Sequence, residues 1–115
     1  MRTATLHKTA LRNAIYDAYT FVSNLIDIAG DGYLPPSADP FEAESEGAYL
    51  IMTENKTGPG LKWSSVRDVL LGLREYMVVQ GHSFELCFTI AQEGVGVSLG
   101  AGYVLRGKPR TQFAK

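Results

Sequence analysis

The residues best suited to catalysis in this 115-residue chain are its one cysteine, Cys87, and the histidine nearest to it in the sequence, His82. Cys87 could act as a nucleophile with His82 as its base, because a neighbouring imidazole activates a thiol. The spacing argues against this pair, since His82 falls at an expected helix–strand junction and Cys87 in the middle of a strand. An extended chain would separate them by roughly 15 Å. Cys87 is better explained as a small apolar side chain under a helix or at an interface.

Paired carboxylates are a second possible source of chemistry. Asp27 with Asp31, and Asp68 with Glu75, could do acid–base work, but such pairs are common on solvated helix faces. A single cysteine excludes a cysteine-based zinc site, and any other transition-metal site would have to recruit carboxylates. We therefore assign no catalytic residue, no metal and no cofactor, and an enzyme is less expected than a binding protein.

Basic residues in the second half of the chain could bind an anion. Arg67 and Arg74 could line such a site together with Lys62, although surface charges at these spacings are commonplace on helices. The segment 106–115 forms a basic tail without an acid, and a solvated terminus explains it best. A nucleic-acid role would require a larger basic face with interleaved aromatic residues, so we expect no nucleic-acid partner.

The glycine-rich stretch GVGVSLGAG, residues 94–102, raises the question of a phosphate-binding loop. A dinucleotide-binding fingerprint needs a different glycine spacing and a following helix, and here more strand follows. Within a strand, Gly96, Gly100 and Gly102 lie on one face, which is then nearly bare backbone. The favoured explanation is close packing of the protein's own helix, and the alternative is a partner chain or a ligand.

Hydrophobic periodicity predicts the elements that would position these residues. Apolar residues at steps of three and four predict a helix over 6–29 that Gly30 ends. The segment 31–46 is acidic, contains three prolines and is predicted to be a loop. A buried strand from Ala48 follows, then a turn over 57–60, and a helix that Ser65 and Asp68 would cap. Alternating and glycine-rich segments predict a hairpin of two strands, 83–92 and 95–105.

This order predicts a single α+β domain spanning 1–115. Two helices would pack on one face of a small, mainly antiparallel sheet in the order α-β-α-β-β, with the glycine-rich strand at the centre. Gly72, inside the second helix, suggests close approach of another backbone. The three strands would leave exposed edges and a partly uncovered face, which favours a homodimer.

Composition is that of a globular protein, with 45% hydrophobic and 20% charged residues. The net charge of −1 is unevenly distributed, because residues 27–55 hold seven acids and no lysine or arginine. No apolar run approaches the roughly 20 residues that a membrane-spanning helix needs, so we expect no membrane insertion. Residues 1–15 lack the pattern of a signal peptide, so any secretion signal would be one already removed.

The block LKWSSVRDVLLGLREYMVVQGHSFELCFTIAQEGVGVSLGAGYVL, residues 61–105, resembles a family of small, mostly uncharacterised fungal proteins, many of them predicted to be secreted. The resemblance covers about 40% of the chain and concerns packing residues, so it implies a fold and a compartment but no catalytic role. The residues that carry it are Leu61, Trp63, Asp68, Leu70, Gly72, Leu73, Phe84 and Gly100.

Secretion also agrees with Asn55-Lys56-Thr57, which is an N-glycosylation acceptor at a strand end. The unpaired Cys87 argues mildly for the alternative, a cytoplasmic protein. The function expected first is a secreted, effector-like fungal protein that binds an unknown protein partner or surface. The alternative is a small-ligand binding protein or an enzyme, with a pocket between sheet and helices lined by Tyr49, Trp63, Tyr76 and Tyr103.

Overall fold

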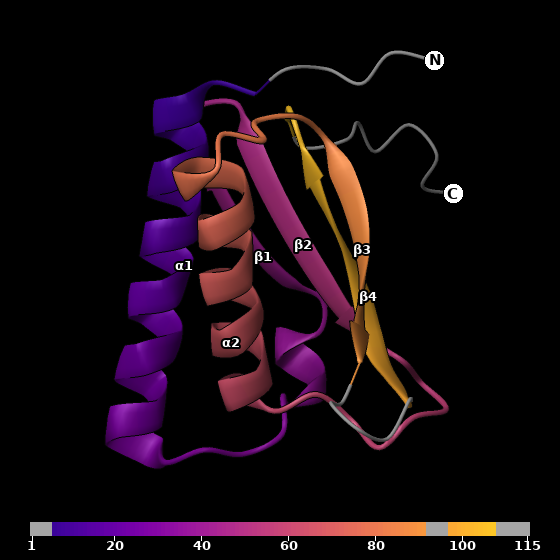
Figure 1. The fold of residues 1–115 in the computed structure, drawn as a ribbon. Coiled ribbons are helices and arrows are strands. Elements are labelled where there is room, and N and C mark those ends of the chain that lie inside the picture. Colours follow the sequence, from indigo (N-terminus) through magenta and orange to yellow (C-terminus); the bar gives the residue numbers. More distant parts are fainter. Residues whose placement is uncertain (1–5, 92–96, 108–115) are drawn as a thin grey trace, which may run out of the picture.

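Two helices lie on one face of a four-stranded antiparallel sheet in the computed structural model, which describes residues 6–91 and 97–107 (Figure 1). The predicted α+β class and the placement of the helices are confirmed. The sheet has one strand more than expected, so the order is α-β-β-α-β-β and the strand order across the sheet is β1-β2-β4-β3.

The first helix, α1 (Lys8–Ala29), forms where the apolar period predicted it. One side of the helix is buried against the sheet and the second helix, as its 3.6-residue repeat requires. His7 caps the beginning, where its Nδ1 accepts a hydrogen bond from the backbone N–H of Ala10. Gly30 ends the helix with a positive φ of 83° and donates its N–H to the carbonyl of Ile26.

The acidic segment 31–46, predicted to be a loop, contains a short 3₁₀ turn and an edge strand, β1 (Phe41–Ser45). β1 pairs with β2 (Ala48–Glu54) through a two-residue hairpin. Its turn residues Glu46 and Gly47 both have positive φ, which is the geometry that matches the twist of paired strands. The loop prediction was wrong for 41–45. These residues can form a strand despite their acids, because alternate side chains point to opposite faces of the sheet and the acids of β1 lie on the face away from the helices.

The second helix, α2 (Trp63–Leu73), begins two residues before the predicted cap at Ser65. Lys62 occupies the cap position and makes no side-chain cap bond. Asp31, just after the C-terminal end of α1, caps α2 instead. Its carboxylate accepts hydrogen bonds from the backbone N–H of Ser64 at 2.9 Å and from the Ser64 hydroxyl at 2.7 Å. The predicted pairing of Ser65 with Asp68 is therefore replaced by a cap from a distant segment.

A π-helical turn, Arg74–Val79, continues α2 and ends before Gly81, which has a positive φ of 82°. The backbone N–H of Gln80 reaches back five residues to the carbonyl of Glu75, as a π-helix requires. The space where a side chain at Gly72 would begin is open, with no atom within 4 Å of that position other than the adjacent residues and the backbone of the same helix. The close backbone approach predicted at Gly72 is thus wrong.

The strands β3 (Leu86–Ala91) and β4 (Ser98–Leu105) form the predicted antiparallel pair, and β4 lies between β2 and β3 as expected. Gly102 is paired with Phe88 on one side, and the Phe88 ring lies where a Gly102 side chain would be. A Cβ at Gly102 would also lie 2.6 Å from the carbonyl oxygen of Ile51. The face of β4 that lacks a side chain at Gly102 is thus contacted by the Phe88 ring of the neighbouring strand β3, and not by the backbone of a helix.

The core fills the space between the helices and the inner face of the sheet. Within the described residues, the side chains buried to less than 2% exposure come from both layers and from the segment before α2. Close packing between helices and sheet fixes the position of α1 and therefore of the surface grooves that flank it. The largest of these side chains are Leu11, Leu50, Met52, Leu61, Leu70, Met77, Val22, Val66 and Val104.

Candidate binding groove

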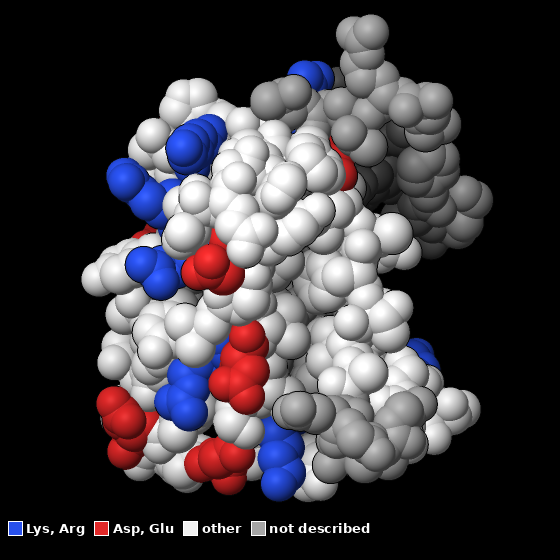
Figure 2. Space-filling model, viewed as in Figure 1, with Lys and Arg blue, Asp and Glu red and all other residues white. Residues whose placement is uncertain are grey.

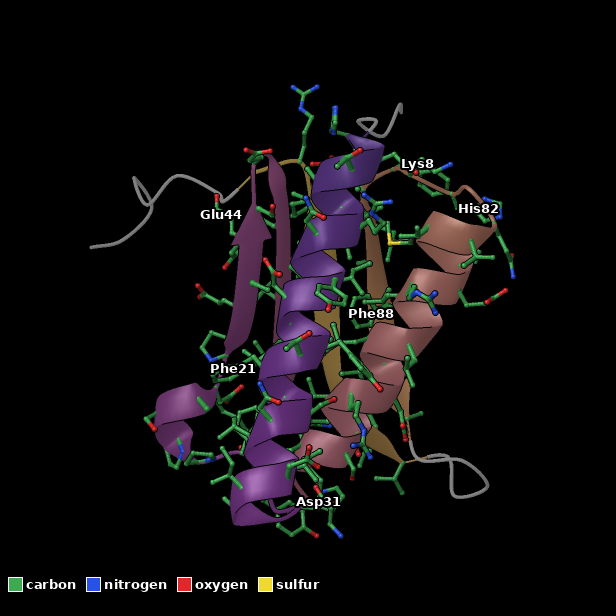
Figure 3. The ribbon with its side chains drawn as sticks, turned by 90° about the vertical axis from the view of Figure 1, so that its left-hand side faces the viewer. Lys8, Phe21, Asp31, Glu44, His82 and Phe88 are labelled. Atoms are coloured by element: carbon green, nitrogen blue, oxygen red, sulfur yellow. The ribbon has the colours of Figure 1, made fainter. Side chains whose placement is uncertain are left out.

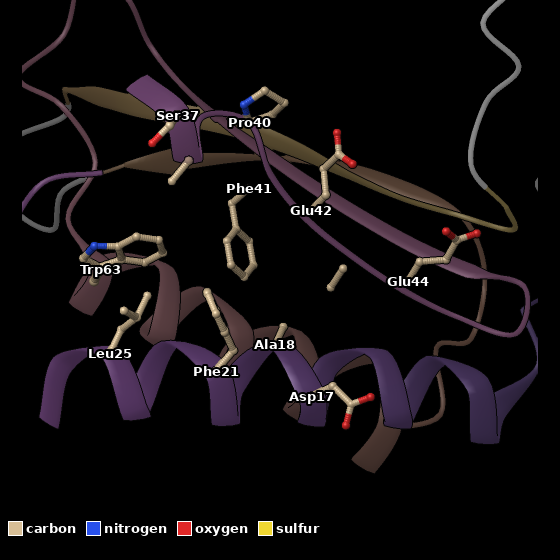
Figure 4. A pocket seen from close by; sticks show the side chains of 12 residues that line it. Asp17, Ala18, Phe21, Leu25, Ser37, Pro40, Phe41, Glu42, Glu44 and Trp63 are labelled. Carbon is tan, nitrogen blue, oxygen red and sulfur yellow. The ribbon is translucent and has the colours of Figure 1, made fainter. Parts of the chain in front are cut away.

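An open groove lies between α1 and β1, and we call it the α1–β1 groove (Figure 4). Its volume is about 590 Å³. α1 forms one wall, β1 and the 3₁₀ turn form the other, and Trp63 stands at one end. The lining residues are Asp17, Ala18, Phe21, Leu25, Ser37, Ala38, Pro40, Phe41, Glu42, Ala43, Glu44 and Trp63.

Three aromatic rings from three different elements meet in this groove. Phe41 from β1 is buried, Trp63 from the start of α2 is half-buried, and Phe21 from α1 is 55% exposed. The ring centroids of Phe41 and Trp63 are 6.1 Å apart in an edge-to-face arrangement, and Phe21 lies 6.4 Å from each. The groove therefore offers aromatic surface that runs from a buried floor to solvent.

The charged side chains that line the α1–β1 groove are all acidic. Asp17 comes from α1, and Glu42 and Glu44 come from β1, where their side chains point away from α1 toward the other face of the sheet (Figure 4). No lysine, arginine or histidine is among the described lining residues. Aromatic faces and carboxylates both attract cations, so this arrangement suits a ligand that has a positive charge and an apolar part.

Tyr49 on β2 interacts with the acids of β1 on the face of the sheet away from the helices. Burial, the negative charge of Glu42 and a side-chain hydrogen bond with Glu42 raise the pKa of the Tyr49 phenol to about 12, and the charge of Glu44 contributes. Tyr49 and Glu44 are directly opposite each other in the hairpin register. Tyr49 thus stays neutral and donates to the Glu42 carboxylate on the face of the sheet away from the helices.

The four aromatic residues predicted to line one pocket do not meet. Of these four residues, only Trp63 lines the α1–β1 groove. Tyr49 and Tyr103 belong to the sheet positions that face away from the helices, where Tyr103 is 52% exposed. Tyr76 stacks on His82 at the far end of α2, with centroids 4.3 Å apart.

The predicted glycine sites have separate outcomes. Gly102 is buried beneath Phe88, which leaves no room there for a ligand or a partner. Gly100 is also buried, and a side chain on it would run into the backbone of Thr53 and Glu54. Gly96 lies outside the described residues.

The predicted glycosylation acceptor, Asn55, is half-buried in the turn after β2. Its Oδ1 accepts hydrogen bonds from the backbone N–H and the hydroxyl of Thr57, at 3.1 and 3.0 Å. Its Nδ2, the atom that a glycan would modify, donates a long bond of 3.5 Å to the carbonyl of Ser98. Thr57 and the neighbouring Lys56 are exposed.

Cys87 is exposed, so its predicted place under a helix is wrong, and the alternative place at an interface stays a prediction. In the register of the sheet it lies opposite Tyr103, on the face away from the helices. In the described part of the chain, no group of three His, Cys, Asp or Glu side chains is arranged to hold a metal ion. No helix in that part is both long and apolar enough to cross a membrane.

Sequence reasoning missed most of the groove, including Phe21, Phe41 and all three acids. The missed signal is the alternation FEAES at 41–45 followed by Glu-Gly, which is typical of a strand that enters a tight hairpin. With β1 recognised, the acids at positions 42 and 44 would have been assigned to one side of an edge strand.

The comparisons with known proteins assign no family. No model of a protein family matches the chain, and no curated protein or solved structure matches it either.

Proposed function

We propose that this chain is a binding protein whose α1–β1 groove receives a positively charged segment of a protein partner, together with one apolar side chain of that segment. The observation that carries the proposal is the meeting of three aromatic rings in one open groove whose charged lining residues are all acids. The groove is open to solvent, and the Phe21 ring in it is accessible to a partner.

The apolar side chain would lie over Phe41, between Phe21 and Trp63. These rings come from rigid elements, so little conformational freedom would be lost when they are covered. A lysine or arginine beside this side chain would reach Asp17 on the α1 wall, with the acids of β1 at the outer edge of the groove. Aromatic residues and well-placed charges of this kind dominate the energy of protein interfaces.

Selection from a library of displayed random heptapeptides tests this proposal. The wild-type protein should enrich peptides in which lysine or arginine stands next to leucine, methionine or phenylalanine. The double variant Asp17→Asn/Glu44→Gln should lose the preference for basic residues, because the groove would keep its rings without these two charges. Asp27→Asn/Asp68→Asn removes two acids that do not line the groove and should select as the wild type does. Enrichment of acidic peptides, or equal selection by both double variants, would contradict the proposal.

We also propose that the protein is secreted and belongs with the small fungal proteins that residues 61–105 resemble. The acceptor triplet Asn55-Lys56-Thr57, whose last two residues are exposed, supports this compartment. Protein secreted by eukaryotic cells should lose mass on N-glycosidase treatment, and Asn55→Gln should not. Unmodified secreted wild-type protein would count against the proposal.

The homodimer stays a prediction. The sheet face away from the helices would be its contact surface, since Tyr103 and Cys87 are exposed there. Light scattering that finds only monomer at high protein concentration would rule it out.

A further inference from the structure

A second groove lies on the other side of α1, between α1 and α2, and we call it the α1–α2 groove. Figure 3 shows α1 in front of the sheet, with β1 on one side of it and α2 on the other. The volume of the groove is about 560 Å³, similar to that of the α1–β1 groove. Its lining residues are Arg12, Asn13, Ile15, Tyr16, Tyr19, Leu70, Leu71 and Arg74.

The α1–α2 groove has one basic end. The two helices run in opposite directions (Figure 1), so Arg12 near the start of α1 and Arg74 just after α2 lie toward the same end. Basic side chains gather over this end of the helices in the space-filling view (Figure 2). The sequence had suggested Arg74 with Arg67 and Lys62, but the structure places Arg74 with Arg12 instead.

The two guanidinium groups are available for a ligand. Both arginines are exposed, and neither side chain forms an ion pair or a hydrogen bond within residues 6–91 and 97–107. No acid is among the described lining residues. Arg74 also begins the π-helical turn, and its backbone N–H is shared between the carbonyls of Leu70 and Leu71. Such turns recur at functional sites because they change the direction of side chains within a helix.

The rest of the groove is apolar. Ile15 and Leu70 are buried and form its floor, and Tyr16 and Leu71 form exposed walls, with 65% and 42% of their surfaces accessible. Tyr19 lies seven residues after Arg12, so the groove extends on the order of 10 Å along α1 from its basic end. A chain of about eight carbons spans this length, at roughly 1.2 Å per bond.

We propose that the α1–α2 groove binds a single-chain organic acid of about this length. The carboxylate is held by Arg12 and Arg74, and the hydrocarbon chain covers Ile15 and Leu70 between Tyr16 and Leu71. Arginine is suited to the head group because its planar fork pairs with both oxygens of a carboxylate. This site is independent of the proposed peptide-binding function, since it lies on the opposite side of α1 and selects the opposite charge.

Titration of the full chain with octanoate, followed through its backbone amide resonances, tests the proposal. Saturable shifts are expected for residues 12–19 and 70–74. Arg12→Gln and Arg74→Gln should each weaken octanoate binding about tenfold or more, because each removes a charge-assisted hydrogen bond. Both arginines are exposed, so the fold should survive, and unchanged amide spectra of the free variants will verify this.

Two controls separate charge from apolar contact and one groove from the other. Arg67→Gln removes a charge on α2 that does not line the groove and should leave octanoate binding unchanged. Asp17→Asn/Glu44→Gln should also leave it unchanged, whatever the peptide selection shows. Octyltrimethylammonium has a similar chain and the opposite charge, and it should not shift residues 12–19 and 70–74. Equal shifts with both amphiphiles, shifts confined to another surface, no saturable shift, or full affinity in both arginine variants would each overturn the proposal.

Discussion

At the scale of single residues, two glycines that look alike in the sequence have opposite roles. Gly102 lies in β4, where the Phe88 ring and the backbone of β2 leave no space for a side chain. Gly72 lies inside α2 with open space around the position of a Cβ. Glycine is thus required by packing at the first position and only lowers helix stability at the second.

These two glycines give a matched pair of substitutions. Gly102→Ala should lower the free energy of unfolding by about 1–3 kcal/mol, because the added methyl group forces Phe88 and the strand to shift. Gly72→Ala should raise it by about 0.5–1 kcal/mol, because alanine restricts the unfolded chain and favours the helix. Urea unfolding of both variants checks the signs. A neutral Gly102→Ala would mean that Phe88 does not occupy this position.

At the scale of elements, the beginning of α2 depends on a residue 32 positions earlier than its first residue. Asp31 follows α1 and accepts two hydrogen bonds from Ser64, and the carbonyl of Gly32 accepts one from the Trp63 N–H at 2.9 Å. The hydrogen bonds from Ser64 and the nearby charge of Lys62 lower the pKa of Asp31 below its usual value. This contact joins the end of one helix to the start of the other and fixes Trp63 at the α1–β1 groove.

Removal of this cap should destabilise the protein in a pH-dependent way. Asp31→Ala should lower the free energy of unfolding at pH 7 by about 0.5–1 kcal/mol, the lower part of the usual range, because the site is exposed. Since the folded-state pKa is lowered, the contribution of Asp31 is present above its unfolded pKa of about 3.9 and is lost as the pH falls through the folded value. The difference between wild type and Asp31→Ala should therefore close in acid.

The matched control is Asp68→Ala, which removes the acid that the sequence had assigned to the cap. It should change stability by less than about 0.5 kcal/mol, because Asp68 is an exposed residue inside α2. Urea unfolding at several pH values compares the variants. A larger loss at Asp68 than at Asp31 would restore the capping scheme predicted from the sequence.

The elements that the sequence predicted well are those with a strong local period. The apolar residues of α1 recur every three or four positions, and those of β3 and β4 recur at alternate positions, because each element buries one side against the rest of the protein. β1 was missed because its acids and the three prolines before it are typical of loops, and only its pairing with β2 makes it a strand. The cap at Asp31 and the meeting of Phe21, Phe41 and Trp63 depend on contacts between distant segments, which no local pattern contains.

At the scale of the whole molecule, α1 separates two grooves of opposite charge. The α1–β1 groove has only acids among its charged lining residues, and the α1–α2 groove has only arginines. A net charge of −1 conceals this separation. Both grooves rest on the same core between helices and sheet, so a ligand of either charge would meet a preformed surface.

The central claim is that the α1–β1 groove binds a basic, apolar segment, and the fluorescence of Trp63 tests it most directly, because Trp63 is the only tryptophan of the chain and lines this groove. Titration with the capped tripeptide Arg-Leu-Arg should give a saturable change that weakens with added salt, since salt screens exposed charges. Titration with capped Glu-Leu-Glu should give none. An equal response to both peptides, or no saturable response to Arg-Leu-Arg, would contradict the account.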